Sequence, residues 1–265
     1  SEAARPVRVL PELLEPRERL KREGVENFLV FFGSARTQSS EDLEREIASV
    51  DLGLKERPED RKLLRERSQL QALRKASRYH DDAVELAREL TEWSKSLKDP
   101  KHRFYICSGG GPGMMEAANK GSSLAGGRSI GLGISLPFEQ SNNPYISHSL
   151  NFEFHYFFIR KYWFLYLAKA LIVFPGGFGT MDELFEMLTL IQTQKTRKRI
   201  PIVLYGFDFW NRLIDWDLFV EWGMISASDL DLFRVFDSVE ETKNFVVEQV
   251  HRTFIDQNQL GLNSP

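Results

Sequence analysis

A glycine-rich loop followed by an acid is the part of the sequence best suited to chemistry. Residues 171–183 read LIVFPGGFGTMDE, so an apolar run ends at a proline, and a threonine and two carboxylates follow the glycines. The run is typical of a buried parallel strand, and the residues from Thr180 onward predict a helix. The free N–H groups at the N-terminus of this helix favour an anion such as phosphate. We therefore predict a phosphate site, with Glu183 beside the group that the phosphate carries. The glycines of this loop can take positive φ values and let a ligand approach the main chain; they are Gly176, Gly177 and Gly179.

Two further strand-to-loop turns carry small residues. The strand expected at 104–107 leads into Ser108–Gly113, which holds four glycines, and a helix is expected at 114–120. The strand expected at 27–32 leads into Gly33 and Ser34. Ligands in parallel sheets lie at the carboxyl ends of the strands, where all three turns fall. We therefore expect one site built from three turns.

Glu183 also fits a purely structural role. Thr180 and Glu183 have the spacing of a capping box, in which both side chains satisfy N–H groups at a helix start. The exposed backbone of the preceding loop favours the functional interpretation, in which Thr180 donates to a phosphate and the carboxylate faces a sugar. Asp182 points about 100° around the helix and is not expected to share that role.

Arg160 and Lys161 lie in a segment that is otherwise aromatic and aliphatic. Such surroundings disfavour a solvated charged face, so one of the two is expected to reach a buried anion or carboxylate. The planar donor fork of arginine suits that role. We expect Arg160, near the start of its helix, to face the glycine loop and Glu183, and Lys161 to be rotated away.

Several common site types do not match. In the 108–113 loop, Met114 stands where a dinucleotide fingerprint needs its third glycine, and no Gly-Lys-Ser/Thr follows either loop. The five histidines are scattered, so no metal site is predicted, and no serine has a G-x-S-x-G setting. The basic run 195–199 is explained by a helix C-terminus, with a nucleic-acid patch as the alternative.

Composition limits the class of protein. The chain has 265 residues, 42% of them hydrophobic, which suffices for one large α/β domain. A net charge of −3 gives no general attraction to nucleic acid or to an anionic membrane. The single cysteine excludes an internal disulfide framework and indicates a reducing compartment. Neither a signal peptide nor a membrane span is predicted, so we expect a cytoplasmic protein.

Short apolar strands alternate with helical patterns along most of the chain. This rhythm predicts a Rossmann-like, doubly wound parallel sheet with helices on both faces. We expect an N-terminal arm at 1–26, a single nucleotide-binding domain at 27–257 and a tail at 258–265. Residues 38–98 are expected to contain a helical insertion, because they are charged, poor in glycine and amphipathic, with a break near Pro58. The later elements expected are strands at 129–136, 170–174, 201–204 and near 235, and helices at 154–169, 180–194, 209–222 and 239–256.

The motif Pro175–Glu183, preceded by Arg160 and Lys161, resembles the LOG family, whose pattern is PGGxGTxxE. The 108–113 segment, the 137–140 loop and residues 188–193 resemble its larger bacterial branch. The resemblance covers about residues 28–216 except roughly 38–78, so the role of that insertion is left open. Members of the family are nucleoside 5′-monophosphate phosphoribohydrolases, formerly labelled possible lysine decarboxylases.

The resemblance implies an enzyme that hydrolyses the N-glycosidic bond of an AMP-like nucleoside 5′-monophosphate to free base and ribose 5-phosphate. It implies a homo-oligomer, at least a dimer, and requires no cofactor or metal. A non-catalytic carrier of a nucleotide or of the molybdenum cofactor is the alternative. The base is left open, as is whether Arg160 contacts the phosphate or Glu183. The implied catalytic residues are Glu183 and Arg160, and the implied binding residues are Gly176, Gly177, Gly179, Thr180, Gly110, Gly111, Met114 and Ser34.

Overall fold

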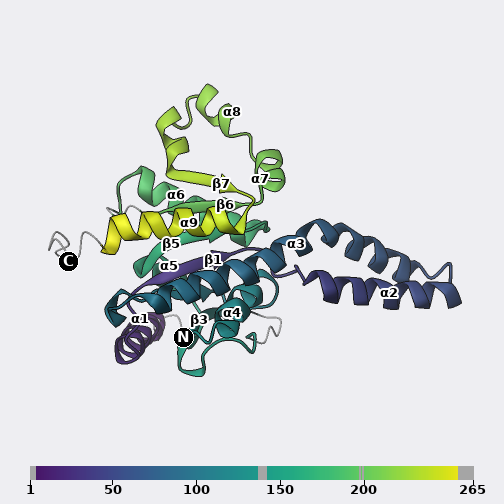
Figure 1. The fold of residues 1–265 in the computed structure, drawn as a ribbon, viewed down its shortest axis with the longest axis horizontal. Helices are drawn as coiled ribbons and strands as arrows, with labels where there is room; N and C mark the ends of the chain where they lie inside the picture. Colours follow the sequence, from purple (N-terminus) through teal and green to yellow (C-terminus); the bar gives the residue numbers. More distant parts are fainter. Residues whose placement is uncertain (1–3, 137–141, 197, 199, 256–265) are drawn as a thin grey trace.

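The computed structural model describes residues 4–136, 142–196, 198 and 200–255. Seven strands form one sheet, in the order β4-β3-β2-β1-β5-β6-β7, and every neighbouring pair is parallel (Figure 1). This arrangement confirms the predicted Rossmann-like fold. The strands are β1 (Phe28–Phe32), β2 (Tyr105–Ser108), β3 (Ser129–Ile134), β4 (Asn151–Phe154), β5 (Ala168–Val173), β6 (Ile202–Tyr205) and β7 (Phe233–Phe236).

Helices cover both faces of the sheet (Figure 1). The α-helices are α1 (Arg5–Arg22), α2 (Ser40–Glu56), α3 (Arg61–Ser96), α4 (Met114–Leu124), α5 (Phe157–Tyr166), α6 (Phe178–Gln192), α7 (Phe207–Leu213), α8 (Trp216–Glu221) and α9 (Val239–Val250). The shorter helical turns are η2 (Pro100–His102), η3 (His148–Leu150), η4 (Ala227–Leu232) and η5 (His251–Ile255).

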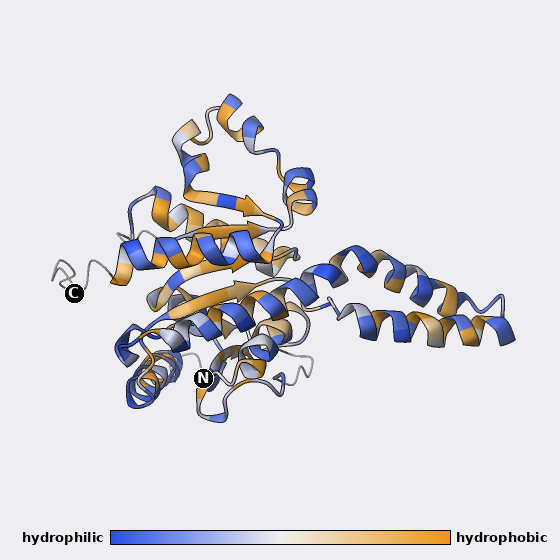
Figure 2. Cartoon of the chain, in the orientation of Figure 1, coloured by the Kyte–Doolittle hydropathy of each residue, from blue (hydrophilic) through white to orange (hydrophobic). Residues whose placement is uncertain are grey.

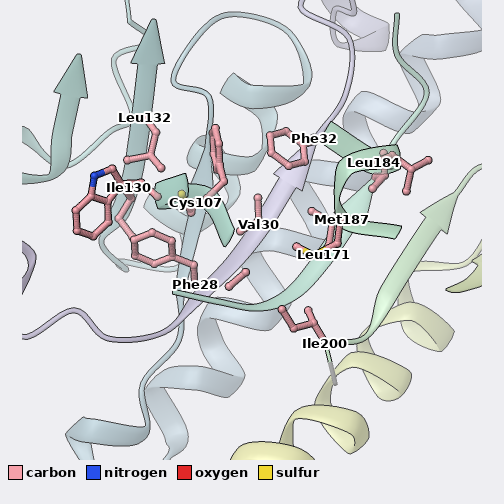
Figure 3. Packing of buried hydrophobic residues seen from close by; sticks show 14 of the residues in the cluster. Phe28, Val30, Phe32, Cys107, Ile130, Leu132, Leu171, Leu184, Met187 and Ile200 are labelled. Atoms are coloured by element: carbon pink, nitrogen blue, oxygen red, sulfur yellow. The ribbon is translucent and has the colours of Figure 1, made fainter. Parts of the chain in front are cut away.

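The central strand β1 shows why the chain folds into three layers. All five of its residues are buried. Phe28, Val30 and Phe32 point to one face, into a core shared with α1, α5, α6 and α7 (Figure 3). Leu29 and Phe31 point to the other face, towards α3, α4 and α9. A strand that is apolar on both faces needs helices on both, and in Figure 2 the strands are mainly orange whereas α3 and α9 show much blue on the side towards the viewer.

The predicted helical insertion is a long hairpin. Helix α2 ends at Glu56 and α3 begins at Arg61, on either side of Pro58, as the proline predicts. The pair extends from the carboxyl-end edge of the sheet (Figure 1). Its outer part has a small core of its own, made of Leu43, Ile47, Val50 and Leu70. The second half of α3 packs on α4 and α9, so one helix connects the hairpin to the main core.

Three expected element boundaries were wrong. The helix expected at 154–169 is shorter, because residues 151–154 form the edge strand β4 and Ala168 already belongs to β5. The helix expected at 209–222 is two helices, α7 and α8, separated by Ile214 and Asp215. The C-terminal helix ends at Val250 and continues as a π-helical turn.

The N-terminal residues interpreted as an arm form helix α1, which packs against the sheet through Leu20. Pro16 lies inside this helix and has no N–H, so the Glu12 carbonyl loses its usual partner one turn later. The indole N–H of Trp163 donates to that carbonyl at 2.9 Å instead. The proline therefore leaves an acceptor that α5 uses, and α1 belongs to the fold.

Some expectations fall on residues outside the described ranges, namely the 137–140 loop, positions 197 and 199 of the basic run, and the 258–265 tail. Among the residues that the structure describes, no helix combines the length and hydrophobicity needed to cross a membrane.

Candidate active site

The three glycine-rich turns meet at the carboxyl ends of β1, β2 and β5, as expected. Strand β1 lies between the other two, and the chain changes direction across the sheet between β1 and β5. The Ser34 N–H donates to the Pro175 carbonyl at 3.0 Å, and the Met114 N–H donates to the Ser34 carbonyl at 2.9 Å. Ser34 therefore connects both glycine loops at the switch point where α/β sheets bind ligands.

The loop after β5 leaves its backbone open. Helix α6 begins at Phe178, with Gly177 as its N-cap and no side-chain cap. A Cβ added to Gly177 or Gly179 would meet no atom within 4 Å, and Phe178 is 96% exposed. The first N–H groups of a helix have no partner within it, so this open end can take an anion. Gly176 differs, because the Thr180 side chain lies against its Cα.

This geometry bears on two features that the sequence raised, the alternative of a capping box and the backbone freedom of the glycines. The helix starts two residues before Thr180, so Thr180 and Glu183 do not form a capping box. Gly176, Gly177 and Gly179 do not have positive φ values; in the other loop, Gly110 and Gly113 do, at 75° and 70°.

Glu183 lies on the inner side of α6 and is only 8% exposed. Burial raises the pKa of its carboxyl to about 7, against the opposing effect of the Arg160 and Lys161 charges. A carboxylate that costs free energy to keep ionised near neutral pH is suited to proton transfer.

Arg160 projects from α5 towards the loop after β2. Its Nε donates to the Leu132 carbonyl at 2.7 Å, and its guanidinium lies 5.1 Å from the centre of the Phe164 ring. One of its terminal nitrogens lies 2.5 Å from where a Cβ on Gly109 would be. Burial lowers the pKa of Arg160, and the Glu183 charge opposes that shift. The described ion pairs do not include one between the two residues, so they interact through a longer distance.

Lys161 faces a different way from Arg160. Its Nζ lies 2.8 Å from a carboxylate oxygen of Asp182 and 2.8 Å from one of Glu186. Both acids are on α6, on either side of Glu183. Lys161 therefore attaches α5 to α6 and fixes the position of Glu183, while Asp182 is engaged outside the site.

The loop after β2 is packed against protein. A Cβ on Gly113 would lie 2.5 Å from the Ser34 carbonyl oxygen. The side-chain amide of Asn143 donates to the carbonyls of Gly110 and Gly111 at 3.1 and 3.0 Å. Asn143 was missed by the sequence analysis, because nothing near it in the sequence indicates that it fixes a distant loop. Met114 is fully buried and packs against Gly33, so it supports the loop from beneath.

A cavity of about 670 Å³ opens beside these loops. Of the residues predicted from the sequence, Ser34 and Gly176 line it, whereas Glu183 and Arg160 lie outside its lining. Within the described part of the chain, no cluster of three or more histidine, cysteine or acidic side chains is placed to hold a metal ion.

Comparison with known proteins identifies relatives of this chain. A family model described as "Possible lysine decarboxylase" matches residues 115–246, a range that includes Arg160, the loop after β5 and Glu183. The cytokinin riboside 5′-monophosphate phosphoribohydrolase LOG of Oryza sativa subsp. japonica is 28% identical over 193 residues, which are 71% of this chain and 72% of that protein.

A second relative matches a shorter stretch. The pyrimidine/purine nucleotide 5′-monophosphate nucleosidase of Escherichia coli strain K12 is 30% identical over 113 residues, 38% of this chain and 24% of that enzyme. Among solved structures, the molybdenum cofactor binding protein of Rippkaea orientalis superposes with a TM-score of 0.47 at 16% identity, over 84% of this chain and 96% of that one.

Proposed function

We propose that this chain, which belongs to the LOG family, hydrolyses the N-glycosidic bond of a nucleoside 5′-monophosphate to free base and ribose 5-phosphate. The names of both relatives support hydrolysis of nucleotides. The observation that carries the proposal is the open N-terminus of α6 one turn before a buried carboxyl whose pKa is about 7.

The phosphate binds at the start of α6. The free N–H groups there and the Thr180 hydroxyl are the donors, and the open space above Gly177 and Gly179 admits the phosphate oxygens. This contact is remote from the glycosidic bond, so its binding energy serves to position the ribose. A nucleoside without phosphate is therefore expected to react much more slowly.

Glu183 acts at the sugar. As the bond between C1′ and the base nitrogen breaks, positive charge develops on the ribose ring, and a nearby carboxylate stabilises it. The ionised Glu183 accepts a proton from the attacking water, whose oxygen bonds to C1′, and the base leaves with a proton from the solvent. Arg160 keeps Glu183 ionised over more of the pH range by its charge, as a positioning residue.

The test is incubation with a panel of nucleoside 5′-monophosphates and the matching nucleosides, with free base and ribose 5-phosphate measured. We expect release of both products from at least one nucleotide, and slow reaction of its nucleoside. Equal rates for AMP and adenosine would contradict the phosphate anchor. Tight nucleotide binding without any product would support a carrier instead.

We further propose that the chain forms a homo-oligomer through α5. Four aromatic side chains on its outer side are 44–60% exposed, and together they make an apolar patch: Phe157, Phe158, Tyr162 and Tyr166. Light scattering at micromolar concentration is expected to give at least a dimer, and Phe158→Asp is expected to shift it towards monomer. A monomer with full activity would refute this proposal.

A further inference from the structure

The cavity beside the loops has an unusual set of walls. Its floor is formed by Ser34, Pro175 and Gly176, at the switch point. One wall is the stretch of α3 from residue 72 to 79, and the other is α7 from residue 208 to 213. Figure 1 shows both helices beside the carboxyl ends of the strands. The cavity therefore adjoins the phosphate loop through Gly176, and its lining does not include Arg160.

On the Arg160 side, the loop after β2 is packed against protein atoms. There, a Cβ on Gly109 would meet Arg160 at 2.5 Å, and one on Gly113 would meet the backbone of Ser34 and Ala35 at 2.5–2.6 Å. A Cβ on Gly110 would be 3.3 Å from Ile146. The cavity offers about 670 Å³, within the ~300–1,000 Å³ typical of small-molecule sites. The cavity between α3 and α7 therefore has room for the base of a nucleotide.

The walls suit a planar heterocycle. Leu73, Ala76 and Phe209 supply apolar surface. The Arg78 guanidinium lies 4.7 Å from the centre of the Tyr79 ring and is held by an ion pair with Asp237. A guanidinium held by these two contacts offers a planar group on which a base can stack.

The position of this wall is fixed by the rest of the fold. Tyr79 is buried, and its ring lies against Gly206, where a Cβ would be 3.1 Å from it. Asp237 accepts the N–H of Phe207 at 3.1 Å as well as pairing with Arg78, so it connects α3 to the start of α7. The wall residues of α3 also lie outside the range of the family match, 115–246.

We propose that this cavity holds the base of the nucleotide, so that the hairpin helix α3, together with α7, selects which base is accepted. This inference rests on the proposed function for its substrate, a nucleoside 5′-monophosphate. Leu73, Ala76, Arg78 and Phe209 are then specificity-determining residues, separate from the sugar and phosphate contacts at Glu183 and Thr180.

The experiment fills the cavity from α3. Ala76→Trp places an indole in the space proposed for the base, and Gln71→Trp is the matched control, because Gln71 is exposed on the same helix and is not part of the lining. We expect Ala76→Trp to raise KM for AMP by about tenfold or more, with an unchanged inhibition constant for ribose 5-phosphate, which has no base. Gln71→Trp is expected to change neither constant.

The outcomes separate this inference from the proposed function. Equal weakening of AMP and ribose 5-phosphate by Ala76→Trp would place the sugar phosphate in the cavity, and no change in either would leave the cavity without substrate; each result overturns the inference. If the wild type hydrolyses no nucleotide, the proposed function fails. The inference is then tested by calorimetry, which measures the dissociation constants of AMP and of ribose 5-phosphate for the wild type and for Ala76→Trp. Ala72→Trp, at a more exposed lining position, replaces Ala76→Trp if that variant does not fold.

Discussion

The two glycine-rich loops have similar sequences and opposite surroundings. In the loop after β2, protein atoms occupy the space where side chains of Gly109 and Gly113 would be. In the loop after β5, the corresponding space at Gly177 and Gly179 is empty. Gly109 and Gly113 of the first loop are needed for the protein to pack against itself, whereas Gly177 and Gly179 of the second keep a helix N-terminus accessible. A glycine-rich loop is therefore evidence for a ligand only when the space above it is open.

Each loop is also paired with one charged side chain. Arg160 lies over the packed loop and is held by the Leu132 carbonyl. Glu183 follows the open loop and is the buried acid nearest to it on α6. The difference favours the open loop for the proposed substrate contact and gives the packed loop a supporting role, and variants of each can test that division.

The largest expected effect is on turnover in Glu183→Gln. Loss of a carboxylate acting in proton transfer is expected to lower kcat by roughly 10²–10⁴-fold, while nucleotide binding is retained and thermal stability near neutral pH is not lowered. Glu186→Gln, on the same helix and paired with Lys161, is the matched control and should keep most of the activity. Rates and melting curves on both variants check this; a less stable Glu183→Gln with normal turnover would make the residue structural.

The loops themselves are expected to respond oppositely to alanine. Gly113→Ala forces a Cβ against the Ser34 backbone at a φ of 70°, so it should lower the free energy of unfolding by about 3 kcal/mol. Gly177→Ala, at a φ of −95° with open space, should change stability by less than about 0.5 kcal/mol. It should instead weaken nucleotide binding, because the methyl group obstructs the phosphate. Urea unfolding and KM measurements on both variants would show that one loses stability and the other loses nucleotide affinity. Equal destabilisation of the two variants would contradict the distinction between a packed and an open loop.

The meeting of the loops could be predicted from the sequence, whereas the division between an open and a packed loop could not. The three turns were expected at one sheet edge because parallel strands place their carboxyl ends together. Arg160 and Lys161 were expected to face different ways because neighbouring helical residues are 100° apart. The structure separates the two side chains, but it places Arg160 on the loop after β2 rather than on the loop before Glu183, and it places Lys161 on the acids of α6.

Other features could not be predicted, because the local sequence carries only a weak signal for them or because they depend on contacts between distant segments. Strand β4 was missed because its alternating residues run directly into the aromatic segment of α5. The start of α6 was placed too late, since Phe178 and Gly179 between glycine neighbours are weak helix formers that a free N-terminus tolerates. The cavity joins α3 and α7, which are more than 100 residues apart, so only the folded chain brings its walls together.

Arg160 is expected to have a smaller effect than Glu183, because it acts through it. Arg160→Ala should lower kcat by about 10–100-fold, and Arg160→Lys should also fail, because a point charge cannot keep the Leu132 contact and the approach to Glu183 together. Lys161→Ala should mainly reduce stability. The double variant Arg160→Ala/Glu183→Gln should lose less activation free energy than the two single variants lose together. Near-normal turnover in Arg160→Ala, with loss in Lys161→Ala, would reverse the assignment.

The smallest expected effect is the pH dependence. With Glu183 acting ionised and its pKa about 7 in the free protein, kcat/KM should rise through pH 7 and fall about tenfold per unit below it. The Arg160 charge lowers this pKa, so Arg160→Ala should move the rise to higher pH. Initial rates at low substrate across pH 5–9 measure both; a profile unmoved by Arg160→Ala would show that the two groups are not coupled.

The same carboxyl should appear in the free energy of unfolding, with a defined sign. Its pKa is about 7 when folded against 4.5 for an ordinary glutamate, so the folded state binds the proton more tightly than the unfolded state. The bound proton therefore stabilises the wild type relative to Glu183→Gln. This contribution to the free energy of unfolding is fully present below pH 4.5 and is lost as the pH rises through 7, a change of about 3 kcal/mol in all. Urea unfolding of both proteins at pH 5, 6, 7 and 8 measures the difference. A constant difference across this range would show that Glu183 is not held in a buried setting, and the open loop would then lose the acid that distinguishes it from the packed one.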